Sequence, residues 1–165
     1  MFSYLLQLSN LRNEFNISSL PFSGKVYLLG LDVEENPSEI QQLIGVCPQD
    51  DVLWGDLTAK EHMDLFAAFK GIQLGSTLTQ AVGAVLAKVE LLNRSNEFAK
   101  AYSGGMKRRL SVALSAVGQV EMILFDEPTT GLDPVSRRKV WDMINFLKKD
   151  RIVALTTHNM VVSKL

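Results

Sequence analysis

The sequence contains a single cysteine, no glycine among its first 20 residues and no apolar run long enough to cross a bilayer. The cysteine, Cys47, excludes an internal disulfide and a zinc site made of cysteines, and it fits a reducing compartment. A membrane-spanning helix needs about 20 consecutive apolar residues, so a membrane, if one is involved, must be crossed by something else. The 17 basic and 18 acidic residues nearly cancel, which predicts no general attraction to nucleic acid or acidic lipid.

The 165 residues, 47% of them hydrophobic, are enough for one sizeable core. Residues 1–20 show no clear periodicity and form an unassigned N-terminal segment. After a turn, a short strand is predicted over residues 25–29, ended by Gly30. A short helix over residues 37–43 and a second short strand over residues 44–47 are predicted next.

Helical patterns begin at Thr58. Thr58 and Glu61 form a capping-box pattern, which satisfies two otherwise unpaired N–H donors at the start of a helix that Gly71 can end. Three large apolar side chains are expected to line one face of this helix: Leu65, Phe66 and Phe69. We interpret His62 as satisfied or solvated rather than as a ligand. A second helix is predicted over about residues 77–92.

A third helix is predicted after Ser103, Gly104 and Gly105. The free N–H groups of its first turn and the positive end of its dipole favour an anion, so this helix start is a candidate phosphate site. Its expected buried stripe consists of Leu110, Ala113, Leu114 and Val117. The basic residues 107–109 are interpreted as a solvated helix face rather than a nucleic-acid patch.

Two carboxylates follow an apolar stretch. Residues 122–125 predict a buried strand that delivers Asp126 and Glu127 to its carboxyl end, where open α/β sheets bind ligands. Asp133 is the predicted N-cap of a helix through about residue 149, and residues 152–156 predict a last buried strand. Strand, helix and strand without a hairpin turn predict a parallel pair joined by a crossover, and hence an α/β fold.

Five motifs between residues 21 and 158 resemble, in the same order, those of the nucleotide-binding domain of ABC transporters. The residues of these motifs are most similar to those of subfamily A, the large eukaryotic transporters associated with lipids. The motifs are Val46-Cys47-Pro48-Gln49, similar to the Q-loop; Tyr102-Ser103-Gly104-Gly105-Met106-Lys107-Arg108-Arg109, similar to the signature; Ile123-Leu124-Phe125-Asp126-Glu127-Pro128, similar to Walker B; Gly131-Leu132-Asp133, similar to the D-loop; and Thr156-Thr157-His158, similar to the switch histidine.

The resemblance implies roles for these residues with ATP and Mg²⁺. Asp126 would hold Mg²⁺, Glu127 would polarise the attacking water, and His158 would orient that water or the γ-phosphate. Gln49 would sense Mg²⁺ and link to a transmembrane partner. The three residues of the signature, Ser103, Gly104 and Gly105, would bind in trans the nucleotide held by a second domain of a head-to-tail dimer.

The resemblance also implies a fold and a division of the chain. The fold would be an incomplete P-loop NTPase-like ABC ATPase fold, with parallel core strands and a helical subdomain. A partial nucleotide-binding domain would cover residues 21–165. Within it, the helical subdomain would span about residues 56–102 and the signature helix residues 103–118.

One family motif, Walker A, is missing from these residues. The only Gly-Lys, at Gly24 and Lys25, fails the pattern G-x-x-x-x-G-K-[ST] because Ser19 replaces the first glycine and Val26 replaces the hydroxyl residue. Without a phosphate cradle in the same chain, we expect weak or no ATP binding and uncertain ATPase activity. We also expect the domain to be truncated at both ends.

The function implied is that of an ATP-binding domain of a lipid transporter, at the cytoplasmic face of a membrane and beside a transmembrane domain. Two alternatives stay open: a non-catalytic module that supplies its signature to a complete partner domain, and an incomplete product that does not fold. A DNA-repair or chromosome-organising ATPase is disfavoured, because only residues 50–102 separate the Q-loop from the signature. Trp54 is equally compatible with a core position and with docking of a transmembrane partner.

Overall fold

The computed structural model describes residues 5–9, 25–73 and 75–157. In chain order the elements are β1 (Leu5–Ser9), β2 (Tyr27–Leu28), β3 (Leu31–Asp32), α1 (Pro37–Leu43), β4 (Ile44–Cys47), α2 (Ala59–Phe69), α3 (Ser76–Lys88), the 3-10 turns η1 (Leu92–Arg94) and η2 (Ala99–Ala101), α4 (Gly104–Ser115), β5 (Met122–Asp126), α5 (Pro134–Leu147) and β6 (Ile152–Thr157).

The main sheet has the strand order β1-β6-β5-β4. The strands β4, β5 and β6 are parallel, with Val46 opposite Leu124 and Leu124 opposite Ala154. β1 pairs antiparallel with the other edge of β6. The predicted parallel pair and the α/β class are therefore confirmed, whereas a strand within the unassigned residues 1–20 was not foreseen.

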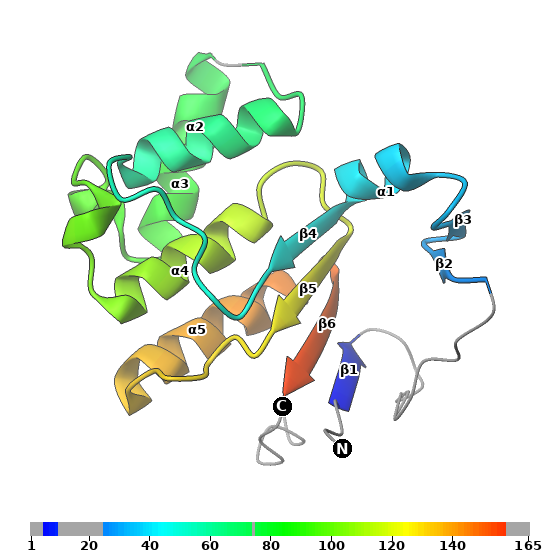
Figure 1. Cartoon of the computed structure of the whole chain (residues 1–165). Coiled ribbons are helices and arrows are strands. Elements are labelled where there is room, and N and C mark those ends of the chain that lie inside the picture. The colour runs from blue at the N-terminus through cyan, green and yellow to red at the C-terminus, as the bar shows by residue number, and fades with distance from the viewer. Residues whose placement is uncertain (1–4, 10–24, 74, 158–165) are drawn as a thin grey trace.

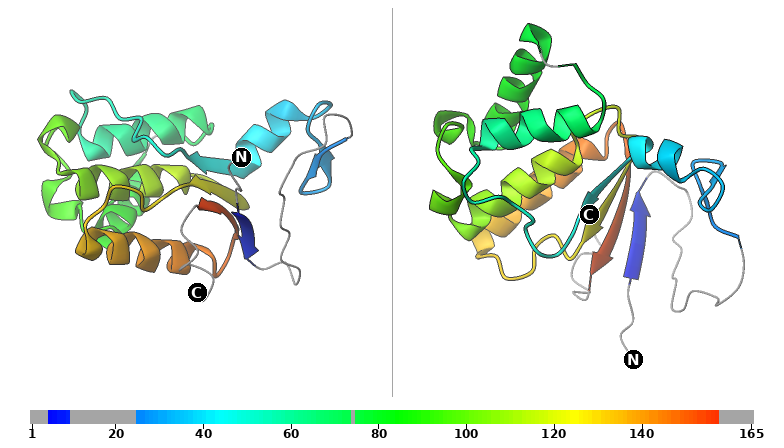
Figure 2. Two further views of the ribbon diagram at one scale, coloured as in Figure 1. Left: turned by 60° about the horizontal axis from the view of Figure 1, so that its bottom comes forward. Right: turned by 45° about the horizontal axis from the view of Figure 1, so that its top comes forward.

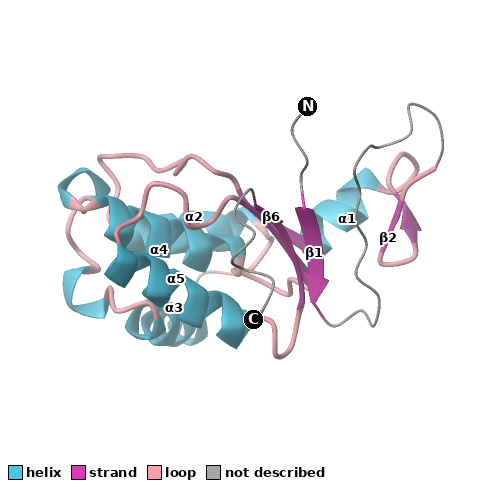
Figure 3. Ribbon diagram, turned by 90° about the horizontal axis from the view of Figure 1, so that it is seen from below, coloured by secondary structure: helices cyan, strands magenta, loops and turns pink. Residues whose placement is uncertain are grey.

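The helices α2, α3, α4 and α5 gather on one side of this sheet (Figure 1). α4 and α5 lie beside the strands, α2 and α3 lie further out, and α1 with the small β2–β3 pair lies beyond the opposite side (Figures 2 and 3). The core fills the space between the helices and the sheet, and Leu110 of α4, Ile123 and Phe125 of β5 and Ile144 of α5 are at most 2% exposed. Because β4, β5 and β6 run parallel, their carboxyl ends come to one edge of the sheet.

The first predicted strand is shorter than expected. β2 turns at Leu29 and Gly30 into β3, which pairs antiparallel with it. Both turn residues have positive φ, at 53° and 83°, the geometry of a tight two-residue hairpin. The strand predicted over residues 25–29 is therefore confirmed only at Tyr27 and Leu28, because Leu29 and Gly30 form the turn of a hairpin.

The capping signals are confirmed. Thr58 and Glu61 form a full capping box at the start of α2. The carboxylate of Asp133 accepts hydrogen bonds from Val135 N at 2.9 Å and Ser136 N at 3.0 Å, so it caps α5. Helix starts could be predicted because the cap and its partners are close in sequence.

The buried face of α2 differs from the prediction. The buried residues are Ala59, His62, Met63 and Ala67, and Phe69 is 69% exposed. α2 packs on α3 and α4 through small and flexible side chains, which leaves the larger rings at the margin. His62 is satisfied, as predicted: Nε2 accepts from Trp54 N at 3.0 Å and Nδ1 lies 2.8 Å from Thr58 O, which assigns the proton to Nδ1.

Candidate functional site

The carboxyl ends of β5 and β6 bring Asp126 beside Thr156, its register partner. The Thr156 hydroxyl donates a hydrogen bond to Asp126 Oδ1. The carboxylate is exposed at this edge and oriented by a side chain of the neighbouring strand. The strand pairing thus places a carboxylate oxygen, which can coordinate a cation, where a ligand at the sheet edge can reach it.

Glu127 begins the turn after β5 and has a positive φ of 43°. A bulky residue with positive φ is a strained conformation that concentrates at functional sites. Its main-chain N–H donates to Thr156 O at 3.1 Å, and its Oε2 accepts from Thr130 Oγ1 at 2.9 Å. The side chain is 7% exposed, so Glu127 is held in one position behind Asp126.

The other predicted site residues are described only in part. Gln49 follows β4 with an exposed side chain, and its main-chain oxygen faces α4. Gly131 has a φ of 73° in the turn before α5, and Leu132 packs against the core. His158 lies outside the described residues. The chemical roles of Asp126, Glu127, Gln49 and His158, and of the D-loop residues, stay predictions.

The signature residues form the exposed start of α4. Ser103 is the N-cap, and its Oγ accepts from Met106 N at 3.3 Å. Gly104 is exposed, and a Cβ built on it would meet no described atom within 4 Å. Tyr102, just before the cap, is buried, and its hydroxyl donates to Arg94 O at 2.7 Å. The buried Tyr102 therefore anchors the helix start, and Gly104 leaves its surface open.

Arg108 overturns part of the sequence interpretation. Residues 107–109 were expected to be a solvated face, yet Arg108 is only 3% exposed and points into the structure. Its guanidinium bonds to Pro128 O at 2.8 Å, Pro48 O at 2.6 Å, Gln49 O at 3.0 Å, Asp126 O at 3.1 Å and Asp51 Oδ1 at 3.3 Å. The sequence contains one signal for the burial of Arg108: Ser111 and Ser115 lie three and seven positions further on, so polar residues recur along one face of the helix. In the structure these two serines are also buried.

The donor set at the sheet edge fits Mg²⁺. This ion is usually bound by one or two carboxylates together with water and substrate phosphates, and seldom by a cage made of protein alone. Asp126 offers an exposed carboxylate, whereas the described part of the chain holds no group of three or more His, Cys, Asp or Glu side chains placed to bind a metal. Asp126 would thus hold the ion together with the phosphates.

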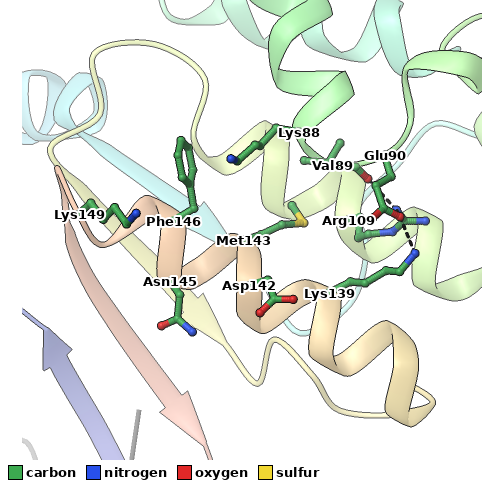
Figure 4. A pocket seen from close by; sticks show the side chains of 10 residues that line it. All are labelled: Lys88, Val89, Glu90, Arg109, Lys139, Asp142, Met143, Asn145, Phe146 and Lys149. Atoms are coloured by element: carbon green, nitrogen blue, oxygen red, sulfur yellow. Dashed lines mark hydrogen bonds and ion pairs between the residues drawn. The ribbon is translucent and has the colours of Figure 1, made fainter.

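A cavity of about 360 Å³ lies between α3, α4 and α5, and Arg109 at the end of the signature motif is one of its lining residues (Figure 4). At its rim Glu90 interacts with Arg109, at 3.2 Å, and with Lys139. The hydrogen bond from Lys139 holds the pKa of Glu90 below its usual range. The salt bridges join Glu90, two residues after α3, to α4 and α5, so this side of the cavity connects the three helices.

The parallel sheet, the carboxylates at its carboxyl edge and the open Ser-Gly-Gly helix start together define an ATP-binding domain of the ABC ATPase class. A solved structure described as an ATP-binding subunit of an ABC transporter superposes with a TM-score of 0.72 at 25% identity, covering 87% of this chain and 60% of that one. Among the described residues, no helix is both long and apolar enough to span a bilayer.

Sequence comparison specifies the family. The family model for ABC transporters matches residues 9–130, so the chain belongs to the ABC transporter family. Its similarity to A family members makes it an ATP-binding domain of the A-subfamily type. ABC transporter A family member 2 of Arabidopsis thaliana is 50% identical over 123 residues, which are 74% of this chain and 12% of that protein. ABC transporter A family member 8 of Dictyostelium discoideum is 43% identical over 140 residues, which are 85% of this chain and 17% of that protein.

Proposed function

We propose that this chain acts as part of the ATP-binding machinery of a subfamily A-type transporter, in which ATP binding and hydrolysis drive a lipid-like substrate across a membrane. The family match and the site at the edge of the sheet support this proposal. Its partners are a second ATP-binding domain in a head-to-tail dimer and a transmembrane domain, and its place is the cytoplasmic face of the membrane. Nucleic acid is not a proposed partner.

In this proposal Asp126 holds Mg²⁺ and Glu127 polarises the attacking water. The fixed position of Glu127, with its strained backbone and its bond from Thr130, supports the second role. Gln49 senses the ion and links to the transmembrane partner, and His158 orients the water or the γ-phosphate. Phosphoryl transfer depends mostly on positioning and charge stabilisation, which is what such groups supply.

The chain is divided in this proposal into a helical subdomain over about residues 56–102 and a signature helix over residues 103–118, within a partial domain of residues 21–165. The packing of α2 and α3 outside α4 supports this division. Ser103, Gly104 and Gly105 act on the nucleotide of the second domain, and Gly131, Leu132 and Asp133 form the D-loop.

The exposed start of α4 carries the proposal. N–H groups at a helix start bind phosphate, and here Gly104, the first residue after the cap, faces open space, whereas Gly105 packs against Ser136 of α5. By contrast, these 165 residues contain no P-loop pattern, so the backbone cradle and its lysine are missing for a nucleotide bound to this chain. We propose that the chain alone binds Mg-ATP weakly and contributes to a site whose phosphates are held by its partner.

The first test is calorimetric titration of the full chain with Mg-ATP. The expected result is no binding in the micromolar range, because the cradle for the β- and γ-phosphates is missing. A micromolar dissociation constant would overturn the proposed weakness of the isolated chain. A cooperative thermal melt of the same sample excludes the alternative that the chain is an unfolded product.

The second test is association with a complete ABC ATP-binding domain, with and without ATP. ATP-dependent association is expected, and Gly104→Ala is expected to weaken it because the added methyl group occupies the surface offered to phosphate. Gly83→Ala in α3 is the matched control, since a Cβ there also meets no described atom within 4 Å. Loss of association in both variants, or in neither, would contradict the assignment of the α4 start.

A non-catalytic module is the second candidate, and the missing Walker A pattern is the observation that favours it. This candidate has two forms, which differ in the ATP hydrolysis of the complete domain when this chain is added. A module that completes a composite site raises the rate, and one that blocks it lowers the rate. A rate that does not change, despite ATP-dependent association, argues against both effects.

A further inference from the structure

Arg108 joins three segments that are far apart in the sequence. Its guanidinium donates from α4 to the main-chain oxygens of Pro48 and Gln49, which follow β4, and to those of Asp126 and Pro128, at and beyond the end of β5. These partners lie 18 to 60 positions away in sequence. One side chain thus connects the signature helix with both segments at the carboxyl edge of the sheet.

The chemistry of this contact is specific to arginine. A buried cation must be paired or fully hydrogen-bonded, because its desolvation is otherwise too costly. The side chain of Arg108 is 4% exposed, and its only carboxylate partner in the described structure, Asp51, is 21% exposed and at 3.3 Å. Main-chain oxygens therefore take most of the donors. A planar fork of five N–H groups on three nitrogens can reach acceptors spread over a wide region, whereas the three donors of a lysine ammonium all start from one nitrogen.

Arg108 lies close enough to the start of α4 to link its own contacts to that start. Arg108 lies five residues after Ser103, less than two turns from the exposed helix start. A helix is stiff over this length, so a displacement of residues 48–51 or of the β5 end reaches the helix start without passing through a loop.

We propose that Arg108 is a positioning residue that makes the segment after β4, the end of β5 and the start of α4 one mechanical unit. The proposal rests on the function proposed above, in which the α4 start meets a nucleotide and the segment after β4 meets a transmembrane partner. A load on the segment after β4 is then delivered to Ser103 and Gly104 through Arg108. Arg108 itself touches no reacting group.

Amide hydrogen exchange of the full chain, resolved by peptide, tests this proposal in the absence of any partner. In Arg108→Lys, exchange within residues 48–54 and 126–130 is expected to rise about tenfold or more, because hydrogen bonds to a charged group are lost. Peptides of α3 should change far less. Val112→Ala, which removes two methyl groups from a fully buried side chain of the same helix, is the control for a general loss of stability.

The exchange pattern decides between positioning and simple stabilisation. If Arg108→Lys raises exchange evenly along the chain, as expected for Val112→Ala, or leaves residues 48–54 unchanged, the proposal is overturned. If Arg108→Lys does not melt cooperatively, Asp51→Ala decides instead: a rise confined to residues 48–54 supports the proposal, and no rise overturns it.

Association with a complete ATP-binding domain separates this inference from the proposed function. ATP-dependent binding by the wild-type chain that weakens in Arg108→Lys but not in Gly83→Ala supports delivery to the α4 start. Equal binding by wild type and Arg108→Lys, with altered local exchange, would overturn the proposal that Arg108 transmits a displacement of the segment after β4 to the start of α4. Failure of the wild-type chain to bind contradicts the proposed function alone, because the exchange result does not depend on it.

Discussion

The ammonium nitrogen of Lys70 lies 2.7 Å from the main-chain oxygen of Ile44, the first residue of β4. The same nitrogen lies 2.6 Å from the oxygen of Gln41, in the last turn of α1. Lys70 follows α2 directly, so it joins the outer helices to the amino end of β4, just as Arg108 joins α4 to the carboxyl end. β4 is an edge strand of the main sheet, opposite the edge formed by β1, and has β5 as its strand partner. Two cations therefore hold both ends of the edge strand from the helical side.

Replacing Lys70 by methionine should destabilise the fold by about 1 to 2 kcal/mol. The substitution keeps most of the aliphatic stem but removes charged hydrogen bonds to carbonyls at the end of α1, which then lose their donor. Urea unfolding followed by circular dichroism measures the loss as a lower midpoint with an unchanged slope.

Lys60→Met is the matched control for this prediction. Lys60 is exposed in the first turn of the same α2 helix. Its replacement should change the free energy of unfolding by less than about 0.5 kcal/mol. Equal losses in the two variants would show that the contacts of Lys70 with β4 contribute nothing specific.

Gly45→Ala should abolish cooperative folding or cost about 3 kcal/mol or more, because it overpacks a contact between β4 and α4. A Cβ built on Gly45 would lie 1.8 Å from the main-chain oxygen of Ser115, and a backbone atom cannot move aside as a side chain can. A thermal melt measures the effect. Gly83→Ala, at an open helical position, should instead be neutral or stabilising by about 0.5 to 1 kcal/mol. A Gly45→Ala protein that melts like wild type would refute the close approach of α4 to β4.

Local signals were sufficient for much of the fold. Thr58, Ser103 and Asp133 were expected at helix starts, and each caps its helix through partners two or three residues away. The apolar run before Asp126 became β5, with the carboxylate at its carboxyl end. These features depend on neighbours in the sequence, so the periodicity and the capping rules contain the required information.

Features that depend on distant partners could not be predicted in this way. The close approach of Gly45 to Ser115 follows from how α4 crosses the sheet, and the acceptors of Arg108 are main-chain oxygens that carry no side-chain signal. The bond from Thr156 to Asp126 depends on the register between β5 and β6. The exposed Phe69 shows the same limit, because the packing partners of α2 decide which of its apolar residues are buried.

The capping box of α2 should make stability depend on acid pH. Thr58 donates to Glu61 Oε2 from its main-chain nitrogen at 2.7 Å and from its hydroxyl at 2.8 Å, and these bonds lower the pKa of Glu61. Because the folded-state pKa lies below the unfolded one, the stabilisation is full above the unfolded pKa and is lost as the pH falls through the folded pKa. The melting temperature of Glu61→Ala should therefore lie below that of wild type at pH 7, and the gap should close below about pH 4.

Glu39→Ala is the comparison for Glu61. Glu39 lies in the first turn of α1, whose N-cap residue makes no side-chain capping bond. Its removal should give a smaller change in melting temperature at neutral pH. If the gap between Glu61→Ala and wild type is the same at pH 7 and at pH 3, ionised Glu61 is not the stabilising form.

Cys47 should resist thiol reagents in the folded protein. It is fully buried at the end of β4, and burial raises the pKa of its thiol to about 11. Thiolate is the reactive form, so at pH 8 the native chain should react far more slowly with a disulfide reagent than the chain in denaturant, where the pKa is about 8.5. Comparable rates in the two conditions would place Cys47 at an accessible position.

The same thiol should make stability fall at alkaline pH. The folded-state pKa of Cys47 lies above the unfolded one, so the folded chain holds a proton that the unfolded chain releases between about pH 8.5 and 11. Stability from this group is full below the unfolded pKa and is lost as the pH rises toward the folded pKa.

Cys47→Val keeps an apolar side chain and cannot titrate, so the titrations of lysine and tyrosine residues cancel when the two proteins are compared. The free energy of unfolding of wild type should fall relative to Cys47→Val by about 2 to 3 kcal/mol between pH 8 and pH 11, measured by urea unfolding. Parallel curves for the two proteins would mean that the thiol ionises equally in both states, which is incompatible with its burial beneath α4.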